Sequence, residues 1–109
     1  MKTKIASNGR YFYERQAAIC KAFANPTRIQ ILDLLGKKER SACELQRELG
    51  ITKANLSQHL AILRGAGAVV TRREGKQLYC SLAMAEIKQA CSLIRAVLRR
   101  QSQGSWVGR

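Results

Sequence analysis

The stretch from Ser41 to Leu63 constrains the fold of this chain more than any other segment. Ser41 and Glu44 have the spacing of a capping box, which begins a helix, and Gly50 suits the left-handed conformation that ends one. Thr52 then provides an N-cap for a second helix. Apolar residues recur on one face of each helix: Ala42, Leu45 and Leu49 on the first, and Leu56, Leu60 and Leu63 on the second. Two short helices joined by a glycine-containing turn are typical of a helix-turn-helix.

The opposite face of the second helix is built for hydrogen bonding and carries no acidic residue. It consists of Lys53, Ala54, Ser57, Gln58 and Ala61. Short side chains let a helix approach a polyanion closely, and the lack of carboxylates avoids repulsion, so this face favours insertion into a DNA groove. The alternative is an ordinary helical hairpin whose polar face is only solvated.

The charge of the chain narrows its possible partners. Its 109 residues include 20 Lys and Arg against 7 Asp and Glu, a net charge of +13 at pH 7. A polyanion relieves the resulting self-repulsion, which makes nucleic acid the first candidate and an anionic membrane surface the second. No apolar run approaches the roughly 20 residues of a membrane span, and the N-terminus lacks the apolar region of a signal peptide. We therefore expect a cytoplasmic protein with no membrane partner.

The chain divides into three parts in our prediction: a mobile arm over residues 1–9, a folded domain over 10–101 and a disordered tail over 102–109. A helical pattern runs from Tyr11 to Ala24, and Asn25-Pro26 ends it and begins a second helix that extends to about Leu35. The residues expected to face inward are Phe12, Ile19 and Phe23 on the first helix, and on the second either Ile29, Leu32 and Leu35 or their neighbours Ile31 and Leu34.

After the helix-turn-helix, the periodicity from Ala68 to Leu82 changes to the alternation of a two-stranded hairpin. Its turn is Glu74-Gly75-Lys76, and cations gather near its tip: Arg72, Arg73 and Lys76. A basic hairpin in this position can lie on phosphates as a wing, although a solvated basic turn is the alternative.

A final helix is predicted from about Ala85 to Gln101. Its apolar stripe is Ile87, Ala90, Cys91, Ile94, Val97 and Leu98. A terminal helix with so long an apolar stripe often pairs with the same helix of a second copy across a two-fold axis.

Three segments together resemble the ArsR/SmtB family of small winged-helix repressors: ANPTRIQILDLL, SQHLAILRGAG and RREGKQLY. The resemblance covers about residues 14 to 100. It implies a mainly α, winged helix-turn-helix fold with a small β-hairpin, and a homodimer packed through its first and last helices. In that dimer we expect the interface to include Phe12, Ile19, Cys20, Phe23, Ile87, Cys91, Ile94 and Leu98.

The resemblance also implies binding to an inverted-repeat operator on double-stranded DNA. The expected DNA contacts are Thr52, Lys53, Asn55, Ser57, Gln58, His59 and Arg64 on and beside the recognition helix, and Arg72, Arg73 and Lys76 on the wing. His59, the only histidine, belongs to the DNA-reading helix in the family pattern; a structural role is the alternative, and one histidine cannot form a multi-histidine metal site.

Four cysteines are the candidate sensor residues, and they lack a C-x-x-C pair. Of the three cysteines in the family's C-x-C-x-x-C metalloid pattern, only the middle one, Cys43, is present in this chain. The two cysteines of the family's persulfide-sensing pair are replaced by Asp33 and by a residue at about Arg99. Because the first and last helices pack together in the family, two of the cysteines could approach each other there. The candidates are Cys20, Cys43, Cys80 and Cys91, as ligands of a thiophilic metalloid or metal, as a redox switch, or as small buried hydrophobes.

We therefore predict a repressor that releases its operator on sensing a thiophilic metalloid or metal, such as arsenite or antimonite. A repressor responding to persulfide or oxidant is the alternative, followed by a nonspecific architectural DNA-binding protein. The sequence carries no constellation typical of an enzyme. No cofactor is predicted beyond a possible metal or metalloid inducer.

Overall fold

The computed structural model describes residues 2–105 of the chain, and the side chains of residues 9–103. It begins with helix α1 (Lys2–Ala22), followed by α2 (Pro26–Lys37). The Asn25 side chain caps α2 by accepting from the backbone N–H groups of Thr27 and Arg28 at 2.9 and 3.1 Å. The predicted break at Asn25-Pro26 is confirmed.

The helix-turn-helix consists of α3 (Ala42–Leu49) and α4 (Lys53–Gly65). Both halves of the predicted capping box are present, since Glu44 N–H donates to Ser41 Oγ and Ser41 N–H donates to the Glu44 carboxylate. The backbone hydrogen bond from Ser41 is the main cause that lowers the pKa of Glu44. Gly50 ends α3 with φ +67°, a left-handed conformation that glycine adopts without steric cost.

The predicted hairpin is present as β2 (Val69–Glu74) and β3 (Gln77–Leu82). Gly75 has φ +62° and no non-glycine residue has a positive φ in the described part of the chain, which fits a two-residue turn of type II′. The hairpin prediction is confirmed, and a third strand that the sequence did not indicate, β1 (Arg40–Ser41), pairs antiparallel with β3 and gives the order β1-β3-β2. Two residues are too short to produce an alternating pattern in the sequence.

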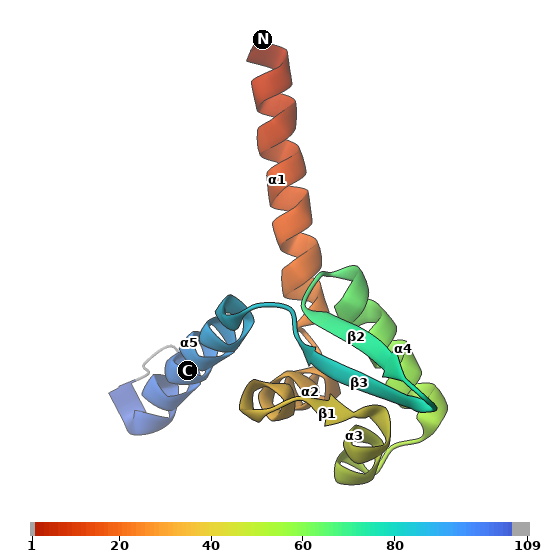
Figure 1. Cartoon of the computed structure of the whole chain (residues 1–109). Coiled ribbons are helices and arrows are strands. Elements are labelled where there is room, and N and C mark those ends of the chain that lie inside the picture. Colours follow the sequence, from red (N-terminus) through yellow and green to blue (C-terminus); the bar gives the residue numbers. More distant parts are fainter. Residues whose placement is uncertain (1, 106–109) are drawn as a thin grey trace.

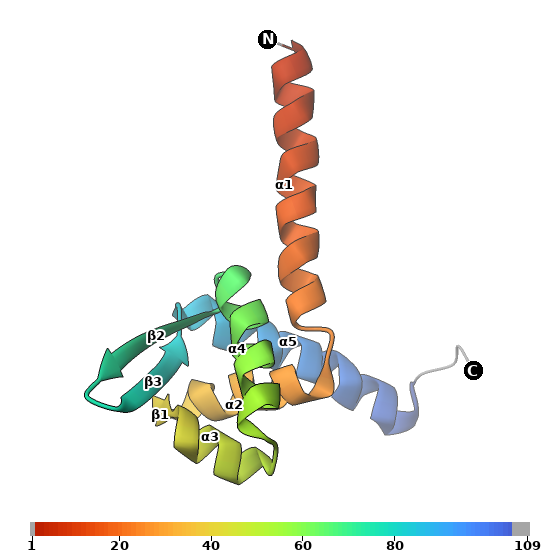
Figure 2. The same ribbon diagram turned by 90° about the vertical axis from the view of Figure 1, so that its right-hand side faces the viewer.

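The core lies between α2, the helix-turn-helix and the sheet. Figure 1 shows the sheet beside α4, with α2 and α3 beneath it, and Figure 2 gives the orthogonal view. Side chains with 2% exposure or less join all these elements: Ile31, Leu32, Leu45, Leu56, Leu60, Leu63, Ala68, Val69 and Cys80. On α2 the structure selects Ile31, Leu32 and Leu35, while Ile29 is 38% exposed. The buried face of α2 therefore combines Leu32 and Leu35 from one of the two sets predicted from the sequence with Ile31 from the other.

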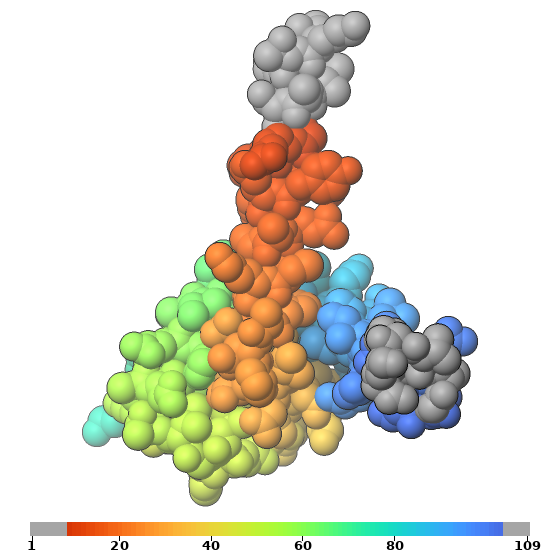
Figure 3. Space-filling view, turned by 180° about the vertical axis from the view of Figure 1, so that it is seen from behind, coloured from red at the N-terminus to blue at the C-terminus, as the bar shows by residue number. Residues whose placement is uncertain are grey.

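The first and last helices project from this core (Figures 1 and 3). Helix α1 begins at Lys2, so residues 2–9, predicted as a mobile arm, continue it; without a proline, even Gly9 costs the helix only about 1 kcal/mol. Helix α5 (Ala85–Arg100) is followed by a π-helical turn, Gln101–Ser105, over the start of the predicted disordered tail. The rest of that tail, residues 106–109, lies outside the described residues.

Within one chain, the predicted inward position of Phe12 is wrong. Its side chain is 69% exposed, and Ile19 and Phe23 are only partly buried. The reason is that only the C-terminal end of α1 meets the core, at Ala22, the one buried side chain among those described on this helix, and the residues before it project away.

Candidate nucleic-acid interface

Helix α4 directs its leucines into the core and its polar residues into solvent. The N-cap is Thr52, whose hydroxyl accepts from Asn55 N–H at 3.1 Å. With Leu56, Leu60 and Leu63 buried, the opposite face is exposed as predicted, and it carries Thr52, Lys53, Ala54, Asn55, Ser57, Gln58, Ala61 and Arg64. An exposed helix face of this composition, free of carboxylates, can approach base edges and phosphates.

His59 differs from its neighbours on α4 because it is half-buried. Its Nδ1 lies 3.3 Å from Nη1 of Arg28, which comes from α2. Desolvation by burial, and secondarily the charge of Arg28, lower the pKa of His59 below its usual value. The imidazole is therefore neutral at pH 7 and is already engaged with the protein on one side.

Arg28 itself was not among the residues singled out from the sequence. Its Nε donates to the carbonyl of Ala22 at 2.6 Å and its Nη2 to the carbonyl of Lys21 at 3.3 Å, both in the last turn of α1. No local pattern reveals this, because the partners lie 6 to 31 residues away in the chain.

The wing arginine Arg72 is held by other side chains. It contacts Glu39 Oε1 at 2.9 Å and Glu74 Oε1 at 3.2 Å, and its guanidinium carbon lies 4.7 Å from the ring centre of Tyr79. Hydrogen bonds to Glu39 first, and then to Glu74, raise the pKa of Arg72. The two carboxylates neutralise this cation and join the wing to the segment before β1, a role that the sequence did not indicate.

Arg73 and Lys76 are the wing cations that remain available. Both are exposed, and in the part of the chain that the structure describes neither has a side-chain hydrogen bond or ion pair. They lie at and beside the turn of the hairpin, where a phosphate could approach them without first displacing a carboxylate.

The four cysteines lie in different surroundings. Cys80 is completely buried on β3 between Arg40 and Thr71 of the neighbouring strands, and burial raises its pKa. The alternation of side chains along the strand places it on the same face as Leu78 and Leu82, toward the body of the domain. Cys20 and Cys43 are exposed, and Cys91 is half-buried on α5, where desolvation again raises the thiol pKa. Among the described residues, no group of three or more His, Cys, Asp or Glu side chains could hold a metal ion.

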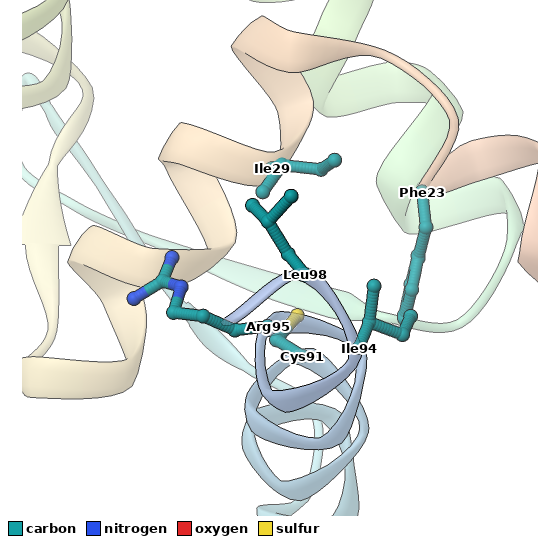
Figure 4. A pocket seen from close by; sticks show the side chains of 6 residues that line it. All are labelled: Phe23, Ile29, Cys91, Ile94, Arg95 and Leu98. Atoms are coloured by element: carbon teal, nitrogen blue, oxygen red, sulfur yellow. The ribbon is translucent and has the colours of Figure 1, made fainter. Parts of the chain in front are cut away.

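Cys91 lies in an apolar pocket of about 220 Å³ between the end of α1, α2 and α5 (Figure 4). The pocket is lined by Phe23, Ile29, Cys91, Ile94, Arg95 and Leu98. Arg95 lies at its edge and pairs with Asp33 of α2 at 3.2 Å. Cys20 is in a separate groove along α1, so neither of these pockets contains both thiols.

The expected dimer-interface residues expose apolar surface. On α5 no residue is buried, and Ile94, Val97 and Leu98 are 58%, 55% and 60% exposed. On α1 a run of aromatics, Tyr11, Phe12 and Tyr13, is exposed as well. Ile87 and Cys91 are partly buried against the core. Within residues 2–105, no helix combines the length and apolar character that a membrane span requires.

Comparison with known proteins gives a consistent result. A family model described as "Bacterial regulatory protein, arsR family" matches residues 25–70. The chain is 40% identical over 89 residues to Rv0081 of Mycobacterium tuberculosis, an HTH-type transcriptional regulator, covering 81% of this chain and 78% of the relative. The crystal structure of Rv0081 matches with a TM-score of 0.78 at 39% identity, over 84% of this chain and 93% of that one.

Two further proteins are similar over most of the chain. The transcriptional activator HlyU of Vibrio cholerae is 36% identical over 82% of each chain, and the structure of its reduced form matches with a TM-score of 0.73 at 34% identity, over 83% of this chain and 95% of that one. The homodimeric winged helix-turn-helix domain Mb0332 of Mycobacterium bovis matches with a TM-score of 0.82 at 28% identity, over 93% and 94% of the two chains.

Proposed function

Because the chain belongs to the ArsR family and is a transcriptional regulator, we propose that it binds an inverted-repeat operator as a homodimer and represses transcription. The observation that carries this proposal is the exposed, carboxylate-free face of α4 together with the wing cations Arg73 and Lys76, whose side chains have no partner among the described residues. The helix face would read bases in the major groove, while the wing cations and the net charge of +13 would hold the phosphate backbone.

The homodimer is supported by the apolar surfaces of α1 and α5. These surfaces face water within one chain, and pairing with a second copy would remove them from it. The similar domain Mb0332 is homodimeric. Two copies related by a two-fold axis would present two recognition helices, which is the symmetry that an inverted repeat matches.

The inducer that we propose is a thiophilic metalloid or metal, such as arsenite or antimonite, bound by cysteines of both subunits. A soft ion held tightly requires at least two thiolates. Cys20 and Cys91 lie on the two helices of the proposed interface, so dimerisation is what could bring them together. Cys80, with no exposed surface, would act as a packing residue, and Cys43 would be a single thiol on α3.

A thiol-redox response is the second candidate. The same two thiols could close a disulfide, and the similar activator HlyU has been solved in a reduced form. Burial raises the pKa of Cys91, and thiol exchange and metalloid binding both need its thiolate, so the titration with each class of compound decides between the two responses.

The operator can be selected from random duplexes with the reduced protein and binding followed by fluorescence anisotropy. We expect at least ~10³-fold preference over random DNA at fixed salt. Weak discrimination would instead identify an architectural DNA-binding protein. In vitro transcription from a promoter carrying the operator should fall when the protein is added; a rise would make it an activator, as HlyU is named.

The inducer test uses the same complex, titrated with arsenite, antimonite, Cd(II), Zn(II) and a persulfide donor. Release by a metalloid should be abolished by Cys20→Ser and Cys91→Ser but retained in the matched variants Cys43→Ser and Cys80→Ala. Release by the persulfide donor alone, reversed by reductant, would replace the metalloid proposal with the thiol switch. If no compound releases the DNA, the cysteines do not sense these compounds and only the DNA-binding proposal stands.

A further inference from the structure

One guanidinium joins three helices of this protein. Arg28 belongs to α2, donates from Nε and Nη2 to the Ala22 and Lys21 carbonyls of α1, and donates from Nη1 to Nδ1 of His59 on α4. The Nε contact, at 2.6 Å, is the shortest of the three. These hydrogen bonds use all three nitrogens of the guanidinium, a planar group with donors in fixed directions.

The contact to His59 fixes the state of the imidazole. Arginine has donors and no acceptor, so Nδ1 of His59 must be the acceptor and carry no proton. The ring is then neutral, and its hydrogen lies on Nε2. Partial burial and the adjacent guanidinium charge both oppose protonation of the ring, which agrees with this assignment.

The contacts to α1 matter because this helix has few other attachments. Among its described side chains, only Ala22 is buried. The carbonyls of the last turn of a helix lack partners within the helix, and a cation there also interacts favourably with the helix dipole. Arg28 therefore holds the end of α1 where the helix meets the core. One of its partners, the carbonyl of Lys21, follows Cys20 directly and also accepts from the backbone N–H of Ala24 at 3.0 Å.

We propose that Arg28 is a positioning residue that couples α1 to the recognition helix, by holding His59 as a neutral Nε2–H donor on α4. A displacement of the end of α1 would change the Arg28 contacts and so reach the DNA-reading helix through a single side chain. The inference rests on the proposed DNA binding of α4 for its consequence, but the contact itself can be tested without DNA.

The first test is ¹⁵N NMR of the imidazole in the free, full-length protein, where the only histidine gives one unambiguous set of signals. The wild type should show an unprotonated Nδ1 and a protonated Nε2 at pH 7. Arg28→Ala should give a mixture of tautomers and a higher pKa for His59. The control Arg99→Ala removes the same charge from an exposed position on α5 and should change neither signal. A protonated Nδ1 in the wild type would overturn the proposal.

The second test measures affinity for the selected operator. Arg28→Ala should weaken binding by roughly tenfold, and the double variant Arg28→Ala/His59→Gln should bind within about threefold of His59→Gln alone, since coupled residues are not additive. Additive losses would overturn the coupling. Arg28→Lys, which keeps the charge but loses the planar fork, should bind as weakly as Arg28→Ala; full activity in Arg28→Lys would show that charge alone matters and also overturn the proposal.

The two tests separate failure of this inference from failure of the proposed function. A wild type that shows the expected tautomer but does not discriminate the operator from random DNA would overturn operator binding. A wild type that discriminates its operator while Arg28→Ala binds equally well would overturn the positioning role alone. If Arg28→Ala does not fold, the wild-type tautomer and the Arg28→Lys affinity still decide the matter.

Discussion

The segment from Asn25 to Leu82 and the two outer helices solve the problem of apolar surface in different ways. The former buries most of its leucines within one chain and turns hydrogen-bonding groups and cations outward. Helices α1 and α5 project from this region (Figure 1) and do the opposite, because α5 has no buried residue and Ile94, Val97 and Leu98 of its apolar stripe face water. A surface of that kind is stable in water when another surface covers it. The comparison indicates a closed region, from Asn25 to Leu82, that is complete in a monomer. Helices α1 and α5 form an open region that requires a partner.

The largest effect is expected where the closed region is broken. Leu63→Ala removes a side chain with no exposed surface from the last turn of α4 and should lower the free energy of unfolding by about 2–5 kcal/mol. The matched variant Ile62→Ala, one residue earlier and 45% exposed, should cost less than about 1 kcal/mol. Urea denaturation at one protein concentration measures both. Equal losses would mean that α4 is not oriented as described.

The next effect tests the open region. Leu98→Asp places a carboxylate on the exposed stripe of α5, and each symmetric dimer would contain it twice. We expect the dimer dissociation constant to rise at least ~100-fold and operator affinity to fall with it. Gln89→Asp adds the same charge to another exposed position of α5, outside the apolar stripe, and should leave the dimer intact. Analytical ultracentrifugation gives the result, and an unchanged dimer in Leu98→Asp would contradict pairing through α5.

The same contrast explains what the sequence could and could not predict. Local chemistry determined the caps at Asn25, Ser41 and Thr52 and the turn at Gly75, because each depends on residues within a few positions. The inward direction of Cys80 followed from alternation along the strand. These features lie in the region that folds on itself.

The missed features depend on residues far apart in the sequence. Arg72 and Glu39 are 33 residues apart in the sequence, and Arg28 and His59 are 31 apart. A periodic pattern of residue types does not predict contacts between such distant residues. The exposure of Phe12 was missed because an apolar residue on an amphipathic helix looks the same whether its own core or a second copy covers it. Pattern alone identifies an apolar face but not the surface that it meets.

A smaller effect is expected within the wing, where the cations differ. Arg73→Ala or Lys76→Ala should each weaken operator binding by about 3–10-fold and reduce the salt dependence by about one ion per subunit, as expected for a lost phosphate contact. Arg72→Ala should leave the salt dependence nearly unchanged, because Glu39 and Glu74 already neutralise that cation. Its ion pairs are exposed to solvent, so the substitution should change the stability of the fold little. Anisotropy titrations at several salt concentrations distinguish these cases; an equal change in salt dependence for Arg72→Ala would make it a phosphate contact.

The smallest expected effect is the pH dependence that His59 adds to the stability of the closed region. Its pKa is lowered in the folded protein, so the unfolded chain binds more protons once the pH falls below about 6.5, the ordinary value of the group. The stabilisation that comes from keeping the ring neutral is therefore complete above that pH and is lost as the pH falls toward the folded-state pKa. Urea denaturation between pH 7.5 and 5 should show this decline in the wild type and less of it in His59→Gln. Glu44 serves as the internal control, since its lowered pKa acts below about 4.5, outside this range. Identical declines in the two proteins would mean that His59 is not held neutral by Arg28 and its burial.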